Sequence, residues 1–154
     1  MKIAVIGGGI FGITTAVILG NEHNVELFEK NDDILKSASG SNQYRVHRGY
    51  HYPRSAETVI GIIKSENSFK EIFSRAIVNE YEHFYCISKR DSLTSSDEFI
   101  NFCKKYGLEI KNSELECVNE DSVDLCVRVN ESVYDPVKLK KVSKELLKNN
   151  NVKI

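Results

Sequence analysis

The feature that most constrains this chain is a glycine cluster that directly follows a short apolar run. Ile3-Ala4-Val5-Ile6 is rich in β-branched residues, which is typical of a strand buried on both faces of a parallel sheet. Gly7-Gly8-Gly9-Ile10-Phe11-Gly12 fits the pattern G-x-G-x-x-G, and apolar residues then recur at helical spacing up to Leu19. A strand, a glycine turn and a helix in this order predict the start of a dinucleotide-binding βαβ unit.

The glycines have separate physical tasks in such a unit. Gly7 makes the tight turn, Gly9 lets the backbone approach a pyrophosphate, and Gly12 allows the helix to pack closely on the strand. The free amides at the helix start then favour an anion. Glu29 ends the next strand, about 20 residues further on, where a carboxylate accepts hydrogen bonds from an adenosine ribose. The alternative is a turn without a ligand and a solvated Glu29.

The rest of the chain predicts a mixed α/β fold. Apolar residues from Val59 to Phe73 trace one helical face. Ser95 and Glu98 form a capping box in front of a helix that ends at Gly107, and Asp135-Pro136 is typical of the start of a last helix. Further strands are predicted over residues 81–88, 125–129 and 133–134, with a short one at 152–154.

A polar and cationic segment distinguishes between two kinds of nucleotide. No acidic residue lies between Ile34 and Ala56, and small hydroxyl and amide side chains are concentrated in the first part of this stretch. Such side chains can hydrogen-bond a pyrophosphate or a ribityl chain, and carboxylates there would repel phosphates. A nicotinamide-binding unit would more often proceed to another ordinary helix. The segment therefore favours FAD over a nicotinamide cofactor.

At this point the chain resembles the D-amino-acid oxidase-like family of FAD-dependent oxidoreductases. The resemblance rests on five stretches: Ile3 to Gly12, Leu27-Phe28-Glu29-Lys30, Ala38-Ser39-Gly40-Ser41-Asn42, Val46-His47-Arg48-Gly49-Tyr50-His51-Tyr52-Pro53, and Asp135-Pro136 with the helix after it. It is strong up to about Ser55 and continues only as a pattern beyond that residue.

The resemblance implies a fold, a cofactor and a reaction. We expect a partial Rossmann-like FAD-binding domain, with residues 1–80 and 135–154, and part of an α+β substrate domain, with residues 81–134. The reaction would oxidise a small amine, amino acid or hydroxy acid by transfer of a hydride to the flavin. Family members are longer, so we expect an N-terminal fragment that is incomplete for catalysis.

Site residues follow from the motif and from the resemblance. The cofactor-binding candidates are Gly7, Gly8, Gly9, Ile10, Phe11, Gly12, Glu29, Lys30, Ser37, Ser39, Ser41, Asn42 and His47. The candidates for catalysis and for holding an anionic substrate are Arg45, His47, Arg48 and His51, although they could also form a basic surface patch. Which arginine would meet a substrate carboxylate stays open.

Composition restricts the partners. The net charge is −1, no apolar run is long enough to span a bilayer, and the four cysteines form no C-x-x-C pair. We therefore expect a cytoplasmic protein with a small-molecule substrate and reduced thiols, without a metal, a nucleic acid or a membrane span. An incomplete sheet would expose apolar edges, so we also expect association with a complementary chain or with another copy. Two alternatives stay open, a nicotinamide-dependent dehydrogenase or reductase and a non-catalytic nucleotide-binding module.

Overall fold

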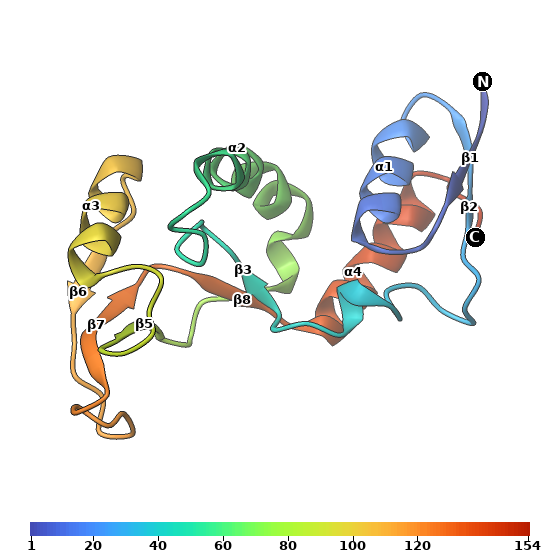
Figure 1. Ribbon diagram of the computed structural model, residues 1–154. Coiled ribbons are helices and arrows are strands. Elements are labelled where there is room, and N and C mark those ends of the chain that lie inside the picture. Colours follow the sequence, from blue (N-terminus) through green and yellow to red (C-terminus); the bar gives the residue numbers. More distant parts are fainter. The chain divides into compact units, whose positions relative to one another are not determined.

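A computed structural model describes residues 1–154 (Figure 1). The strands are β1 (Lys2–Ile6), β2 (Asn24–Phe28), β3 (Arg45–Val46), β4 (Ile77–Val78), β5 (His83–Ser88), β6 (Ile110–Asn112), β7 (Val123–Val129) and β8 (Ser132–Tyr134). The helices are α1 (Ile10–Gly20), α2 (Ala56–Phe73), α3 (Ser96–Tyr106) and α4 (Pro136–Asn149), with short 3₁₀ turns at Ala38–Gly40 and Ser74–Ala76. The predicted mixed α/β class is confirmed.

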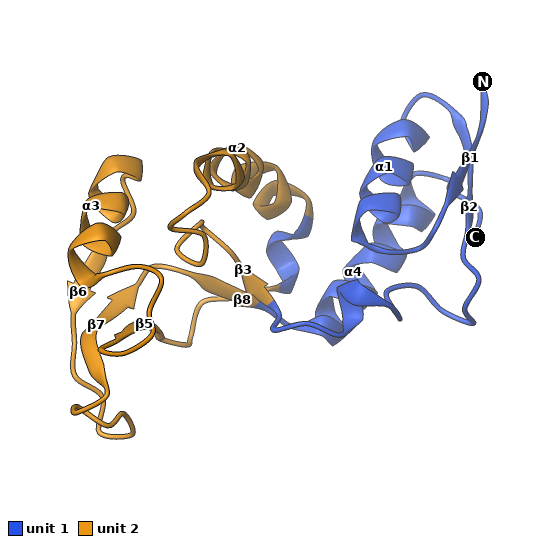
Figure 2. Ribbon diagram, in the orientation of Figure 1, with its two compact units in different colours: residues 1–44, 73–76, 134–154 blue, residues 45–72, 77–133 orange.

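The chain forms two compact units, which Figure 2 shows in different colours. The first unit contains residues 1–44, 73–76 and 134–154, and the second contains residues 45–72 and 77–133. Residues 45–72 thus cluster with the second unit, whereas the predicted domain assignment placed them with the nucleotide-binding part. Compactness and domain identity are different properties, so that assignment stays a prediction.

The first unit is built on a parallel strand pair. β1 pairs with β2 in parallel, from Lys2 beside Asn24 to Ile6 beside Phe28, and α1 connects the two strands. The far side of β2 meets the end of the chain, where the Leu27 amide donates to the Lys153 carbonyl at 2.7 Å. The parallel pairing of β1 and β2 is what the βαβ prediction requires, and the strand predicted at 152–154 is a single parallel bridge from Lys153 to Glu26.

The expectation that the first strand is buried on both faces is wrong for this structure. Ala4 and Ile6 are exposed, and Ile6 reaches 80% exposure. The reason is that α1 packs against β1, β2 and α4, so that helices cover one face of this small sheet. Ile13, Val25 and Leu27 are buried at that covered face.

Helix ends follow the local sequence signals closely. The Asp135 carboxylate accepts hydrogen bonds from the amides of Val137 and Lys138 at 2.8 and 3.0 Å, immediately before the proline that begins α4. In α3, the Ser95 hydroxyl and the Glu98 carboxylate form the reciprocal capping box, and Gly107 ends the helix at a φ of 65°. Both predicted caps are confirmed.

The second unit packs helices on an antiparallel sheet. β7 lies between β5 and β6, and a smaller sheet has the order β3, β8, β4. The core under the larger sheet is made of Tyr50, Val59, Phe99, Phe102, Cys103, Leu108, Val127 and Val129. Its buried aromatic rings fix the segment that follows β3, because Tyr50 is fully buried and its hydroxyl donates to the Glu109 carbonyl at 2.7 Å.

No helix in the structure has both the length and the apolar character needed to cross a membrane. The predicted cytoplasmic location and the predicted association with another chain stay predictions.

Candidate functional site

The glycine loop of the first unit is held by backbone geometry that only glycine meets easily. Gly7 has a φ of +104°, and its amide donates to the Phe28 carbonyl at 2.7 Å, which ties the turn to the end of β2. A Cβ atom at position 12 would lie 1.9 Å from the Gly7 carbonyl oxygen. The start of α1 therefore touches the turn directly, and the predicted roles of these two glycines agree with the geometry around them.

The other two glycines of the loop differ in their surroundings. A Cβ atom at Gly8 would lie 3.0 Å from both the Glu29 carboxylate and the Ile34 side chain, so this position is enclosed. A Cβ atom at Gly9 would meet only the Ser39 hydroxyl, at 3.5 Å. Gly9 therefore leaves the backbone at the start of α1 accessible, as a phosphate-binding loop requires.

Glu29 forms a hydrogen bond with the glycine loop, to Gly8, which lies 21 residues earlier in the chain. Its carboxylate accepts a hydrogen bond from the Gly8 amide at 2.6 Å. It also accepts hydrogen bonds from the backbone and side-chain nitrogens of Asn31 at 2.9 and 2.6 Å. The hydrogen bonds from the Asn31 and Gly8 amides hold the pKa of Glu29 below its usual value. A carboxylate that stays ionised thus stands at the end of β2, next to the glycine loop.

The serine-rich segment contributes one side chain to this loop. The Ser39 hydroxyl accepts a hydrogen bond from the Ile10 amide, the first of α1, at 3.1 Å. The Asn42 carboxamide instead connects its own segment to β8, because its oxygen accepts hydrogen bonds from the Tyr44 amide at 2.6 Å and from the Tyr134 hydroxyl at 2.9 Å. The remaining candidates of this unit have exposed side chains: Phe11, Lys30, Ser37 and Ser41.

The segment also needs a residue without a side chain at position 40, which the sequence analysis did not predict. A Cβ atom there would lie 1.9 Å from the Leu35 carbonyl oxygen, in the 3₁₀ turn that carries Ser39. The glycine therefore helps to place Ser39 near the start of α1.

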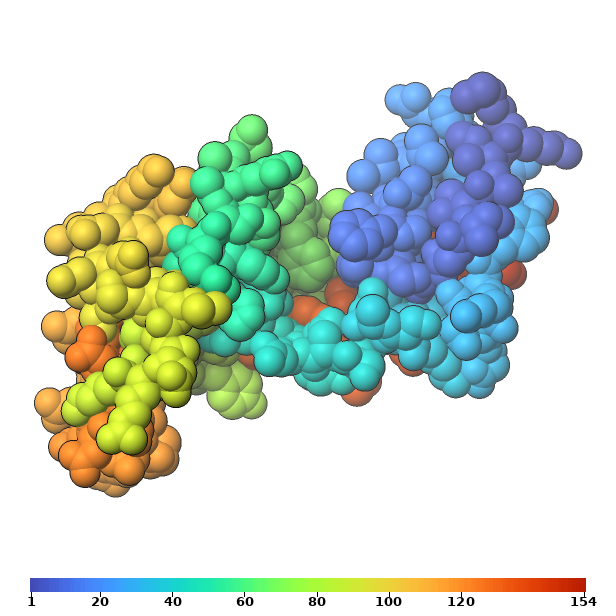
Figure 3. Space-filling model, viewed as in Figure 1, coloured from blue at the N-terminus to red at the C-terminus, as the bar shows by residue number.

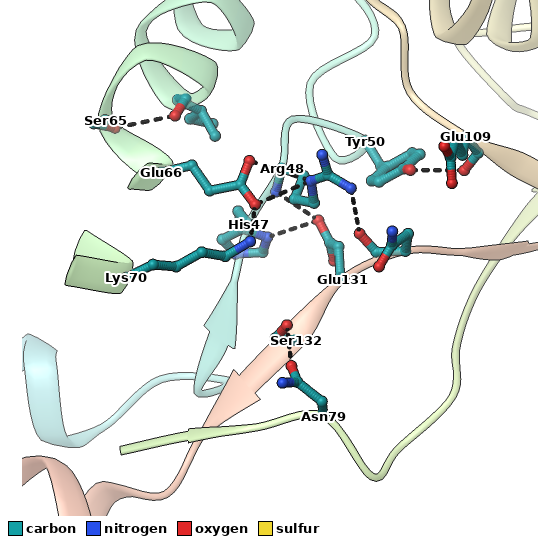
Figure 4. Close-up of polar contacts among 12 residues, drawn as sticks. His47, Arg48, Tyr50, Ser65, Glu66, Lys70, Asn79, Glu109, Glu131 and Ser132 are labelled. Atoms are coloured by element: carbon teal, nitrogen blue, oxygen red, sulfur yellow. Dashed lines mark hydrogen bonds and ion pairs between the residues drawn. The ribbon is translucent and has the colours of Figure 1, made fainter. Parts of the chain in front are cut away.

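Two candidates of the second unit, His47 and Arg48, lie beside a buried carboxylate, Glu131 (Figure 4). Its side chain has no exposed surface, and one oxygen lies 3.1 Å from the Arg45 guanidinium. The other oxygen accepts the Arg48 amide at 2.9 Å and lies 3.8 Å from His47 Nδ1, a distance too long for a hydrogen bond. The Tyr85 hydroxyl donates to the carboxylate at 3.3 Å.

Opposing effects act on the ionisation of this carboxylate. Burial by itself raises the pKa of Glu131, but the His47 ring, the Arg48 amide and the Arg45 charge outweigh burial, and the pKa lies below its ordinary value. For the Tyr85 hydroxyl, burial and then the Glu131 charge raise the pKa. Glu131 is therefore ionised at neutral pH, and Tyr85 keeps its proton.

Arg48 is also neutralised within the unit. Its Nε lies 3.0 Å from the Glu66 carboxylate of α2, and its Nη1 donates to the Asn130 carbonyl at 3.3 Å. Lys70, one turn further along α2, pairs with the same Glu66 carboxylate. The positive charges of Arg45 and Arg48 are thus matched by two internal carboxylates.

Histidine and tyrosine rings extend this cluster. Arg45 lies 4.8 Å from the centre of the Tyr85 ring and contacts His83 Nδ1 at 3.3 Å. Since a guanidinium only donates, His83 Nδ1 accepts, and its Nε2–H is buried without a partner. His47 stacks on His51 with ring centres 5.9 Å apart, and His51 is exposed.

The structure therefore brings the four catalytic candidates of the sequence into one unit, together with Glu131, Glu66, Tyr85 and His83. These four were not predicted. Glu131 and Glu66 are single acidic residues in ordinary polar stretches, so no local pattern distinguishes them. The absence of acidic residues between Ile34 and Ala56 was the available signal, because the unmatched arginines there require carboxylates from elsewhere in the chain.

Comparison with known sequences gives a consistent family. A family model described as FAD dependent oxidoreductase matches residues 2–117. The FAD-dependent monooxygenase FPY4 of Fusarium mangiferae is 29% identical over 133 residues, which cover 82% of this chain and 35% of that protein. The FAD-dependent monooxygenase kojA of Aspergillus flavus is 30% identical over 109 residues, which cover 67% of this chain and 26% of that protein. The chain thus spans about a third or less of these relatives.

Solved structures with the same fold share little sequence. Glycine oxidase from Geobacillus kaustophilus superposes with a TM-score of 0.72 at 16% identity, covering 97% of this chain and 44% of that one. L-proline dehydrogenase from P. horikoshii gives 0.74 at 16% identity, covering 99% and 42%. L-α-glycerophosphate oxidase from Mycoplasma pneumoniae, solved with FAD bound, gives 0.69 at 20% identity, covering 99% and 44%. The fold is that of these three structures.

The contact between Gly12 and Gly7 leads to a first prediction. Gly12→Ala should lower the free energy of unfolding by about 3 kcal/mol, because the new methyl group would overlap the Gly7 carbonyl oxygen. Urea denaturation followed by circular dichroism measures this change. Gly61→Ala is the control, since a Cβ atom at that position of α2 meets nothing within 4 Å, and it should stabilise by about 1 kcal/mol. Equal effects of the two variants would contradict the prediction.

The buried charge of Glu131 leads to a second prediction. Glu131→Gln should cost about 3 kcal/mol of stability at pH 7, because it leaves the Arg45 guanidinium without its counterion. Since folding lowers the pKa of Glu131, its contribution is present above the ordinary value of 4.5 and is lost as the pH falls through the folded pKa. The difference between wild type and variant should therefore shrink below about pH 4.5 in urea titrations at several pH values.

Glu82→Gln provides the control for this experiment. Glu82 pairs with Arg128 in an exposed ion pair, so its loss should change stability by less than about 1 kcal/mol. A deficit of Glu131→Gln that is the same at pH 7 and at pH 3.5, or no deficit at all, would show that the ionised carboxylate is not what stabilises the cluster.

Proposed function

The chain belongs to the FAD-dependent oxidoreductase family, and from this premise we propose that it holds the adenosine diphosphate part of FAD on its glycine loop and serves the oxidation of a small amine, amino acid or hydroxy acid. The observation that carries the proposal is the pairing of Glu29 with the Gly8 amide at 2.6 Å, beside the accessible start of α1. One acidic side chain and one anion-binding helix end are thus placed together.

The residues of the loop fit the nucleotide in chemical terms. The amides at the start of α1 and the helix dipole favour a pyrophosphate, and the Ser39 oxygen on the Ile10 amide marks a position where an acceptor oxygen binds. The Glu29 carboxylate is ionised and would accept hydrogen bonds from ribose hydroxyls. When bound, FAD supplies the acceptor for a hydride at flavin N5.

We assign the second unit to the handling of the substrate. His51 is the exposed member of the stacked histidine pair and is suited to accept a proton from a substrate amine or hydroxyl. Arg45 and Arg48 carry charges that Glu131 and Glu66 already match, so they orient the segment from residue 45 to residue 52. The His47 ring packs against the rings of both His51 and Tyr52.

Monooxygenation is a second candidate function, because the two fungal relatives bear the name FAD-dependent monooxygenase. The two functions differ in the fate of oxygen. An oxidase reduces dioxygen to hydrogen peroxide, whereas a monooxygenase places one oxygen atom in its product. In a longer chain that turns over substrate, reaction under ¹⁸O₂, with mass spectrometry of the product and a peroxide assay, separates them.

FAD binding provides the direct test. The purified protein, mixed with excess FAD and freed of unbound cofactor, should keep flavin absorbance bands at a stoichiometry of about one per chain. Glu29→Ala should weaken FAD binding about tenfold, because the ribose loses a charged acceptor. The control is Glu26→Ala, an exposed carboxylate two positions before Phe28 on β2, which should bind FAD like the wild type.

The outcome that would sink the proposal is also specific. A folded wild-type protein that retains no flavin would leave the two alternatives, a nicotinamide-dependent dehydrogenase or reductase and a non-catalytic nucleotide-binding module. Equal affinities of the Glu29 and Glu26 variants would remove the ribose role of Glu29.

A further inference from the structure

A cavity of about 640 Å³ lies entirely within the second unit. It is bounded by the segment after β3 and by the loop between β5 and α3, whose atoms Figure 3 shows at the surface in teal and yellow-green. The lining residues are Tyr50, His51, Tyr52, Pro53, Arg54, Ser55, Tyr85, Ile87, Ser92, Leu93, Thr94 and Phe99. Its size lies in the range of pockets that take an organic ligand, about 300 to 1,000 Å³.

The charge of this lining is unusual for the chain. The protein has 22 Asp and Glu residues, yet none of them lines this cavity. Four other cavities of the structure each include at least one acidic residue, among them Glu82, Glu114, Asp124 and Glu120. The cavity therefore contains no group that would repel an anion.

Arg54 supplies a free positive charge at the cavity. Arg45 is paired with Glu131 and Arg48 with Glu66, but the exposed Arg54 guanidinium has no hydrogen bond or ion pair within the structure. A planar guanidinium binds a carboxylate through two parallel hydrogen bonds. Of the three arginines in this segment, Arg54 is therefore the one whose charge is available to a ligand.

The walls of the cavity are aromatic and fixed in place. Tyr85 lies 6.3 Å from Phe99 in a stacked arrangement, and Phe99 is 1% exposed. The Tyr85 hydroxyl is held by Glu131, so Tyr85 presents its ring to the cavity. His51 and Tyr52 meet edge to face at 5.3 Å on another side. Such rings favour a flat or ring-shaped apolar body.

We propose that this cavity binds an organic acid that carries an aromatic ring on a short chain, with Arg54 holding the carboxylate and Tyr52 and Tyr85 contacting the ring. The inference rests on the proposed function and deepens it, because His51, which is assigned there to the substrate, lines this cavity, whereas binding of the acid does not require flavin. It also answers which arginine of the segment meets a carboxylate.

The test uses 3-phenylpropanoate as the acid, with 3-phenylpropan-1-ol and propanoate as analogues that lack the charge or the ring. Isothermal titration calorimetry of the purified protein should show that the acid binds more tightly than either analogue. Arg54→Gln should weaken binding of the acid about tenfold and leave the alcohol unchanged. The matched control is Arg90→Gln, which removes the same charge from an exposed position of the neighbouring loop that does not line the cavity.

Three results would overturn the proposal. They are the absence of binding by 3-phenylpropanoate at millimolar concentration, equal affinity for the acid and the alcohol, and equal weakening by the Arg54 and Arg90 variants. Circular dichroism spectra of both variants check that they are folded. Retention of FAD is measured separately by absorbance, so failure of flavin binding and failure of this site are distinguishable.

Discussion

The second unit depends on the neutralisation of one buried carboxylate. Glu131 has no exposed side-chain surface, and an unpaired charge in such a position would be strongly unfavourable. Arg45, the Arg48 amide and the Tyr85 hydroxyl supply the compensation, and they come from two separate parts of the chain, residues 45–48 and β5. Because the carboxylate needs all of these partners, it fixes β3, the segment after it and β5 relative to one another.

A second carboxylate, Glu29 of the first unit, is kept ionised by different chemistry. Glu29 has no cationic partner there, and amide hydrogen bonds from Gly8 and Asn31 keep it ionised. Amide dipoles stabilise the charge without neutralising it, so Glu29 stays able to accept hydrogen bonds from a polar ligand. The Glu131 carboxylate, in contrast, is already paired with side chains and an amide of its own unit. The two carboxylates thus differ in availability, because Glu131 is enclosed by its partners and Glu29 remains the carboxylate that we propose for ribose binding.

The features that could be predicted from the sequence are those that depend on residues close together in the chain. The turn at Gly7 to Gly12, the caps of α3 and α4 and the family resemblance are local patterns, and the fold and the family confirm them. The contacts of Glu131 with Arg45 and Arg48 span more than 80 residues, and no periodicity or spacing records such a pairing. The exposure of β1 could not be predicted either, because it depends on which faces the other elements cover.

The arginines from residue 45 to residue 54 show why charge in a sequence is a poor measure of charge available to a ligand. In the sequence, nothing distinguishes Arg45, Arg48 and Arg54, because each is a cation in a stretch without acidic residues. Folding brings Glu131 to Arg45 and Glu66 to Arg48, and it leaves Arg54 beside an aromatic cavity without a carboxylate. A guanidinium already held by an internal carboxylate gains little from a second anion, whereas an unpaired one gains a full charge-assisted contact. The distribution of buried carboxylates therefore decides which cation stays available to a ligand.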